Sequence, residues 1–236
     1  MPVVTMSGTI ASGAREIGWA AAASLGIDYV DQQLLVDAAR RLGVPVDVMA
    51  GRDERCTSFR ERLAAVLRTF LERSAAGGDP LTGAGGLEVL LGRTYADMAK
   101  EREEPEISDS LYMKTMTAII RELGDRGNIV VLGRGSQMIL RDLPGALHVL
   151  AIAPQELRIE RLTTREGVST EEARRRVHEG DRARAAFHRK FWKVDVNDPS
   201  LYDLTLETSR LPFEVGAELV VAAARAKAES AGPTPS

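Results

Sequence analysis

The chain has 236 residues, of which 44% are hydrophobic and 28% are charged, enough to bury the core of an α/β domain with an appended subdomain. The net charge of -3 excludes a general basic surface for nucleic acid, and no apolar run approaches the roughly 20 residues that span a bilayer. The single cysteine, Cys56, excludes an internal disulfide and a zinc site built from cysteines alone. Because the first residues also lack a signal-peptide pattern, we expect a cytoplasmic protein that binds neither nucleic acid nor membranes.

The chain opens with a predicted strand at residues 3–6, a loop rich in small residues and an alanine-rich helix at residues 14–25. A second strand at residues 29–30 stops at Asp31, so this stretch is predicted to form a βαβ unit. The start of a helix carries free N–H groups and a positive dipole end, and small residues let the backbone approach a phosphate closely. The sequence therefore predicts a phosphate-binding loop between the first strand and the first helix.

The loop matches only part of the P-loop pattern G-x-x-x-x-G-K-[ST]. Gly8 and Gly13 have the required spacing, but Ala14 stands at the lysine position and Arg15 at the hydroxyl position. Arg15 carries a permanent charge and a side chain long enough to reach phosphates, so we expect it to replace the lysine. The alternatives are a tight turn without a ligand and a surface pair between Arg15 and Glu16.

The rest of the chain alternates between predicted helices and strands. Helices are predicted at residues 32–42, 58–74, 108–123, 155–165, 169–193 and 212–226. Strands are predicted at residues 129–132, 147–152 and 203–207. Residues 75–86 and 100–106 are predicted loops, and the tail at residues 228–236 is predicted to be disordered; the apolar run at residues 87–91 is left unassigned.

Five strands separated by helices predict a parallel sheet with helices on both faces. Ligands of such sheets bind at the carboxyl ends of the strands. The loop after Gly8, Asp31, the turn that begins at Gly133 and the turn after Ile152 all fall at this edge. Their convergence predicts a single ligand site there.

Three arginines share one face of the helix at residues 155–165. Arg158, Arg161 and Arg165 are spaced i, i+3 and i+7, and like charges at this spacing repel by about 0.2–0.5 kcal/mol per pair. The stripe therefore predicts an anionic partner, unless it is a solvated face that nearby glutamates neutralise.

The following helix carries further arginines. Arg182 and Arg184 lack clear local partners, whereas Arg175 and Arg176 are predicted to pair with the glutamates four residues before them. His188 is predicted to be a surface or capping histidine. With three histidines and no H-x-x-x-H, a metal site built from histidines is not expected.

Four segments of the chain resemble the cytidylate kinase-like family of P-loop nucleoside monophosphate kinases. They are PVVTMSGTIASGAREI, VVLGRGSQMIL, the arginine-rich stretch at residues 157–192, and DPSLYDLTLETSRL. The resemblance covers roughly residues 2–225 and implies a P-loop kinase-type three-layer sandwich in one domain at residues 1–227. It places a helical acceptor-side region at residues 32–106 and an arginine-rich helical lid at residues 155–193.

This resemblance implies that the chain moves the γ-phosphate of ATP, with Mg²⁺, to a nucleoside monophosphate such as CMP or to a related small acceptor. A nucleotide-binding regulatory module with a degenerate loop and little turnover is the alternative. The resemblance names no protein residue as a metal ligand, and it leaves the oligomeric state open, with a homodimer among the options.

The residues implied to bind the donor are Gly8, Ala11, Ser12, Gly13, Ala14, Arg15, Glu16, Arg161 and Arg165. The residues implied to be catalytic are Arg15, Arg182 and Arg184, of which the last two arrive with the lid. The residues implied to bind the acceptor are Asp31, Arg134 and Gly135.

Overall fold

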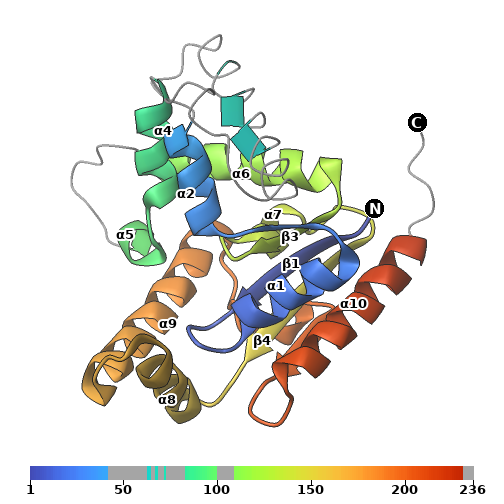
Figure 1. Cartoon of the computed structure of the whole chain (residues 1–236). Helices are drawn as coiled ribbons and strands as arrows, with labels where there is room; N and C mark the ends of the chain where they lie inside the picture. The colour runs from blue at the N-terminus through green and yellow to red at the C-terminus, as the bar shows by residue number, and fades with distance from the viewer. Residues whose placement is uncertain (42–62, 65–66, 69–71, 73–82, 100–108, 231–236) are drawn as a thin grey trace. The chain divides into compact units, whose positions relative to one another are not determined.

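The structure, a computed structural model, describes residues 1–41, 63–64, 67–68, 72, 83–99 and 109–230 (Figure 1). The chain divides into two compact units. The first comprises Met1–Tyr29, Thr94–Glu101 and Gly127–Ser236. The second comprises Val30–Arg93 and Arg102–Arg126.

A five-stranded sheet with the order β2-β3-β1-β4-β5 forms the centre of the first unit. Its strands are β1 (Val3–Gly8), β2 (Asp28–Val30), β3 (Ile129–Leu132), β4 (Ala146–Ile152) and β5 (Leu204–Glu207). The ladders of β1 with β3, β1 with β4 and β4 with β5 are all parallel. The predicted P-loop kinase-type α/β fold is confirmed.

Helices α1 (Ala14–Leu25) and α10 (Phe213–Ser230) lie side by side against the sheet (Figure 1). Small and branched side chains of both helices pack on β1 and β4 in one buried cluster. A Cβ atom on Gly216 of α10 would lie 3.0 Å from the Ile17 side chain of α1, so the glycine allows close contact there. Helix α10 extends four residues past the predicted end at residue 226. The disordered tail predicted at residues 228–236 is therefore wrong for residues 228–230, and residues 231–236 lie outside the described residues.

Helices α8 (Gln155–Glu166) and α9 (Thr170–Trp192) form a hairpin in the predicted lid region. Ser169 caps α9, since its side chain accepts a hydrogen bond from the backbone N–H of Glu172 at 3.1 Å, as the sequence pattern predicts. The apolar cluster inside the hairpin includes Ile10 and Ala11 of the β1–α1 loop as packed neighbours. The hairpin is thus seated on this loop.

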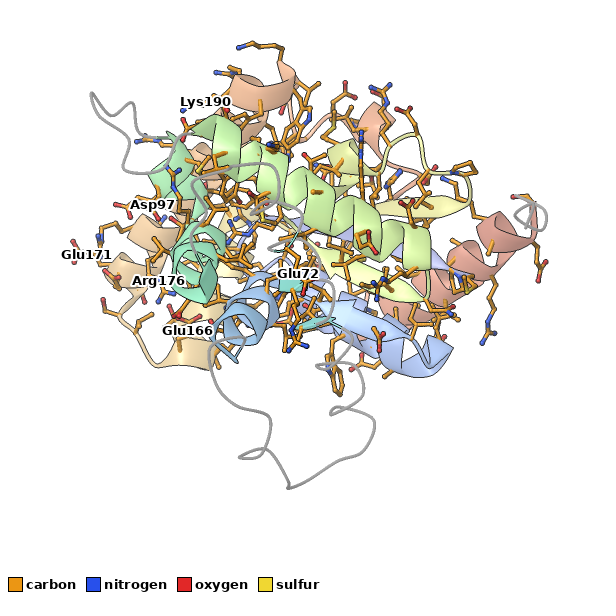
Figure 2. All side chains as sticks on the ribbon, turned by 90° about the horizontal axis from the view of Figure 1, so that it is seen from above. Glu72, Asp97, Glu166, Glu171, Arg176 and Lys190 are labelled. Atoms are coloured by element: carbon orange, nitrogen blue, oxygen red, sulfur yellow. The ribbon has the colours of Figure 1, made fainter. Side chains whose placement is uncertain are left out.

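Two arginines of α9 form ion pairs with glutamates other than the predicted ones. Arg175 pairs with Glu172, three residues away, at 2.6 Å. Arg176 pairs with Glu166 of α8 at 2.6 Å, and both of these residues are labelled in Figure 2. The predicted pairs were wrong for two reasons. The hairpin brings Glu166 of α8 within reach of Arg176, and Arg175 bonds to Glu172 and lies 3.7 Å from Glu179 of its own helix. These exposed pairs contribute little to stability.

Two shorter helices complete the part of the first unit that bears on the site. Helix α7 (Ser136–Ile139) follows β3 after a turn at residues 133–135, and α5 (Tyr95–Ala99) packs on α9. A 3-10 turn, η2 (Pro199–Leu201), precedes β5.

The second unit contains α2 (Gln32–Arg41), α4 (Gly83–Gly92) and α6 (Asp109–Arg126). The unassigned apolar run at residues 87–91 belongs to α4, where Leu87, Leu90 and Leu91 are buried. Residues 83–86, predicted as loop, are also helical. The predicted helix at residues 58–74 and the predicted loop at residues 100–106 lie mostly or wholly outside the described residues.

No helix in the described part of the chain is both long and apolar enough to cross a membrane. The same residues contain no group of three or more histidines, cysteines, aspartates or glutamates suited to a metal ion.

Candidate functional site

The loop between β1 and α1 requires glycine at two positions. A Cβ atom added to Gly8 would lie 2.5 Å from the Ser12 hydroxyl oxygen, and one added to Gly13 would clash with the Phe213 ring. Gly13 also has φ 89°, in the left-handed region that favours glycine. The two glycines that the P-loop pattern singles out are therefore demanded by the geometry of the loop.

The loop and the start of α1 carry polar groups that suit a ligand. The first hydrogen bond within α1 runs from the Ile17 N–H to the Gly13 carbonyl at 2.9 Å, so the N–H groups before it have no intrahelical acceptor. Ser12 is 1% exposed, and its hydroxyl makes no hydrogen bond to any residue that the structure describes. The Thr9 hydroxyl oxygen is also buried and makes no hydrogen bond to a described residue. A buried hydroxyl without a partner is costly and is satisfied by a ligand oxygen or by water.

Arg158 and Arg161 of α8 contact successive carbonyls of this loop. The Arg158 guanidinium donates to both carboxylate oxygens of Asp181 at 3.1 and 2.7 Å, and its Nη1 also lies 3.4 Å from the Ile10 carbonyl. Nη1 of Arg161 lies 3.4 Å from the Ala11 carbonyl. The anionic partner that the stripe predicts is, for Arg158, a carboxylate of the protein itself.

Arg161, which the family resemblance places on the donor, is also held by the end of β5. It donates to the Thr208 hydroxyl at 2.9 Å and to the Thr208 carbonyl at 2.6 Å, and its guanidinium lies 4.9 Å from the centre of the Phe213 ring. Thr208 in turn donates to the Ser12 carbonyl at 2.8 Å. Sequence analysis missed Thr208 because its partners are distant in the chain.

Charged side chains surround the first turn of α1. Arg165 bridges Glu16 at 3.3 Å and Glu166 at 2.9 Å. Arg15 and Arg182 are exposed. Arg182 forms no hydrogen bond or ion pair with the described residues, in agreement with the absence of a local partner in the sequence.

Arg184, in contrast, has several partners and is only 4% exposed. It donates to Asn197 Oδ1 at 2.8 Å, to Ser7 Oγ at 2.9 Å and to the Val196 carbonyl at 3.4 Å, and it lies 3.5 Å from the Tyr202 hydroxyl. The expectation that Arg184 lacks partners was wrong. Ser7 lies 177 positions away in the sequence, so no local pattern could reveal the contact.

His188, one turn after Arg184, is buried and not at the surface as predicted. Its Nδ1 lies 2.8 Å from the Arg184 carbonyl, which can only accept, so Nδ1 carries the proton. Its Nε2 then accepts from Gln137 at 2.9 Å. Burial lowers the pKa of His188 to about 4, and the ring is neutral at pH 7.

The turn after β3 is a run of three residues with positive φ. Gly133, Arg134 and Gly135 have φ values of 72°, 60° and 68°. A Cβ atom on Gly135 would overlap the Trp192 ring, which explains its glycine. Arg134 is 5% exposed, its N–H donates to the Tyr95 hydroxyl at 2.6 Å, and its guanidinium lies 5.5 Å from the centre of the Tyr95 ring. A buried arginine in a strained conformation is typical of a functional turn.

Asp31 belongs to the second unit and caps α2. Its Oδ1 accepts a hydrogen bond from the Leu34 N–H at 3.0 Å. Asp31 as a whole is 7% exposed. This capping role does not depend on a ligand, and acceptor binding by Asp31 stays a prediction.

The loop fits a phosphate chain better than it fits Mg²⁺. Two glycines without room for a Cβ, the buried Ser12 hydroxyl and the start of α1 suit phosphate oxygens. The hydroxyl ligand that a P-loop offers to Mg²⁺ is replaced by Arg15, and Glu16 is engaged by Arg165. The residues of this loop therefore do not form a protein-built site for Mg²⁺.

Comparison with known proteins agrees with these features. The model of the cytidylate kinase-like family matches residues 3–210. A cytidylate kinase of Methanopyrus kandleri is 31% identical over 142 residues, which cover 52% of this chain and 71% of the relative. A cytidylate kinase of Pyrococcus horikoshii is 30% identical over 129 residues, which cover 52% of this chain and 66% of the relative.

A solved structure of an uncharacterized protein from Eubacterium ventriosum has a similar fold. The two share a TM-score of 0.60 at 12% identity, over 95% of this chain and 99% of that chain. At this identity the likeness concerns the fold alone.

Proposed function

The chain belongs to the cytidylate kinase-like family, and on this premise we propose that it transfers the γ-phosphate of ATP to a nucleoside monophosphate of the CMP type. The observation that supports the proposal most is the β1–α1 loop. Its glycines admit no side chain, and the buried Ser12 hydroxyl has no partner among the described residues. Such a loop suits the phosphates of a nucleotide.

In this proposal the protein positions phosphates and neutralises charge, since phosphoryl transfer asks little covalent chemistry of an enzyme. The loop and the first turn of α1 hold the donor phosphates, with Arg15 nearest to the position of the missing lysine. Exposed Arg182 supplies charge to the transferred group as it moves. Arg134 and Gly135 are proposed to bind the acceptor, and acceptor binding by Asp31 stays a separate prediction.

The test is an assay of ATP with CMP, UMP, AMP and GMP in turn, in which both ADP and the phosphorylated acceptor are quantified. We expect transfer to CMP or its nearest analogue. Ser12→Ala removes one hydrogen bond to phosphate, worth about 1 kcal/mol, so ATP should bind about fivefold more weakly. Ser209→Ala, which removes an exposed hydroxyl bonded to Glu207, is the matched control and should leave ATP affinity unchanged.

A second candidate is a nucleotide-binding regulatory module with little or no turnover. Ala14 at the lysine position favours it. In that case ATP binds and Ser12→Ala weakens its binding, but no acceptor yields ADP. Turnover gained by Ala14→Lys would identify the chain as a degenerate kinase, whereas turnover in the unmodified chain would exclude this candidate. Loss of ATP affinity in Arg15→Ala would in either case assign the role of the missing lysine to Arg15.

A further inference from the structure

Thr208, the residue that follows β5, links parts of the first unit that are distant in the sequence. Its N–H donates to the Ile152 carbonyl at 2.9 Å, and its hydroxyl donates to the Ser12 carbonyl of the β1–α1 loop at 2.8 Å. Arg161 of α8 donates to the same hydroxyl at 2.9 Å and to the Thr208 carbonyl at 2.6 Å. Thr208 is 2% exposed, so bulk water does not compete for these bonds.

The hydrogen bonds at the Thr208 hydroxyl have a fixed direction. A guanidinium can only donate, so the hydroxyl accepts from Arg161 and gives its single proton to a carbonyl. The Ser12 carbonyl lies at 2.8 Å and the Ile152 carbonyl at 3.3 Å, so Ser12 is the nearer acceptor. A hydroxyl that accepts from a cation is polarised and donates more strongly. Thr208 therefore holds the Ser12 carbonyl in one orientation.

The bond from Thr208 sets the orientation of the peptide between Ser12 and Gly13. This peptide is trans and planar, so its carbonyl and its N–H point in opposite directions. While the Ser12 carbonyl faces Thr208, the Gly13 N–H faces away from it. Phe213 packs on the Gly13 Cα, where a Cβ atom would lie 2.4 Å from its ring. The contacts of Thr208 and Phe213 thus fix the backbone of Gly13, which directly precedes α1.

We propose that Thr208 is a positioning residue: through the Ser12 carbonyl it fixes the direction in which the Gly13 N–H donates to a phosphate oxygen. Thr208 does not touch the ligand in this role. A donor that is already oriented needs no reorganisation when the ligand arrives, and a small displacement of such a donor weakens the interaction. The contact between Thr208 and the loop is direct, whereas the identity of the ligand, the phosphate chain of a nucleotide, rests on the proposed function.

Two substitutions of Thr208 separate this role from a contribution to stability. Thr208→Val keeps the shape of the side chain and removes the hydroxyl, which releases the Ser12 carbonyl, while Arg161 keeps its bond to the Thr208 carbonyl. Thr208→Ser keeps the hydroxyl and removes a buried methyl group. Both variants should melt below wild type, because the first leaves buried polar groups without a partner and the second leaves a cavity. Only the first should change the orientation of the loop.

The probe is inorganic tripolyphosphate, which carries phosphates and no base, titrated by calorimetry in a buffer without Mg²⁺ or nucleotide. Wild type and Thr208→Ser should bind it within twofold of one another. Thr208→Val should bind it at least about fivefold more weakly, the loss expected for one hydrogen bond. Thr205→Val is the matched control, because Thr205 is exposed in the same strand, and it should stay within twofold of wild type.

Three results would overturn the proposal. The first is equal tripolyphosphate affinity in wild type and Thr208→Val, and the second is no measurable binding by wild type at millimolar tripolyphosphate. The third is an equal loss of affinity in Thr208→Ser and Thr208→Val. Affinity would then follow the melting temperature, and Thr208 would have a structural role only.

Turnover separates failure of this proposal from failure of the proposed function. In an active enzyme, Thr208→Val should raise the KM for ATP about fivefold and leave the KM for CMP unchanged. Weaker tripolyphosphate binding by Thr208→Val, in a protein that forms no ADP with any acceptor, would support the positioning role and reject the kinase. Transfer to CMP with tripolyphosphate affinity unchanged in Thr208→Val would reject the positioning role alone.

Discussion

Protonation of His188 should destabilise the protein in mild acid. The neutral ring donates from Nδ1 to the Arg184 carbonyl and accepts at Nε2 from Gln137, and burial lowers its pKa to about 4. In the unfolded chain a histidine titrates near 6.5. Between pH 6.5 and 4 the unfolded state therefore binds more protons than the folded state, so stability falls as the pH falls through this window.

The size of the effect follows from the shift in pKa. A difference of about 2.5 units corresponds to roughly 3 kcal/mol once both states are protonated, with about 2 kcal/mol already lost by pH 5. This is a large fraction of the 5–15 kcal/mol by which domains are stable. The loss should be complete below pH 4 and absent above pH 7.

Urea unfolding of wild type and His188→Gln at pH 7 and pH 5 measures the effect. Burial also lowers the pKa of His148, so only the difference between the two proteins isolates His188. We expect the variant to be less stable at pH 7 and to lose about 2 kcal/mol less than wild type on moving to pH 5. If wild type and variant lost the same unfolding free energy between pH 7 and pH 5, the reasoning would be refuted. His188 would then have the same pKa in the folded and unfolded states.

Three further substitutions test other parts of the structure. Arg158→Met should cost about 1–3 kcal/mol of unfolding free energy, because Asp181, whose side chain is 32% exposed, loses its charged partner, and an unchanged free energy would show the pair to be weak. Gly135→Ala should lower the melting temperature, since its φ is 68° and a Cβ would overlap Trp192; an unchanged melting temperature would mean that this turn relaxes freely. Ala11→Gly should leave the free energy of unfolding unchanged or raise it by up to about 1 kcal/mol, because Ala11 has φ 58°, in the left-handed region that favours glycine. A clear fall of this free energy in urea unfolding would contradict the expectation.

The parallel sheet and the β1–α1 loop could be predicted because their signals are local. Buried strands appear as apolar runs, and the spacing of Gly8 and Gly13 reflects one loop geometry. The cap at Ser169 was equally readable, since it depends on residues three positions apart. Each of these features is specified within a few residues of sequence.

The partners of the arginines could not be predicted in the same way. Asp181 reaches Arg158 across 23 positions, and Ser7 reaches Arg184 across 177. The burial of His188 depends on aromatic neighbours such as Phe187 and Trp192, whose own positions the fold decides. Sequence patterns identified which arginines were unusual, but the fold determines that one of them is ion-paired and another is a buried cation.

The most direct test of the kinase proposal is the stoichiometry of products. The protein is incubated with ATP, Mg²⁺ and CMP, and phosphorus NMR follows every nucleotide at once. We expect CDP and ADP to appear in equal amounts and neither to form when CMP is omitted. ADP and inorganic phosphate without CDP, or unchanged ATP with each of the four nucleoside monophosphates, would contradict it.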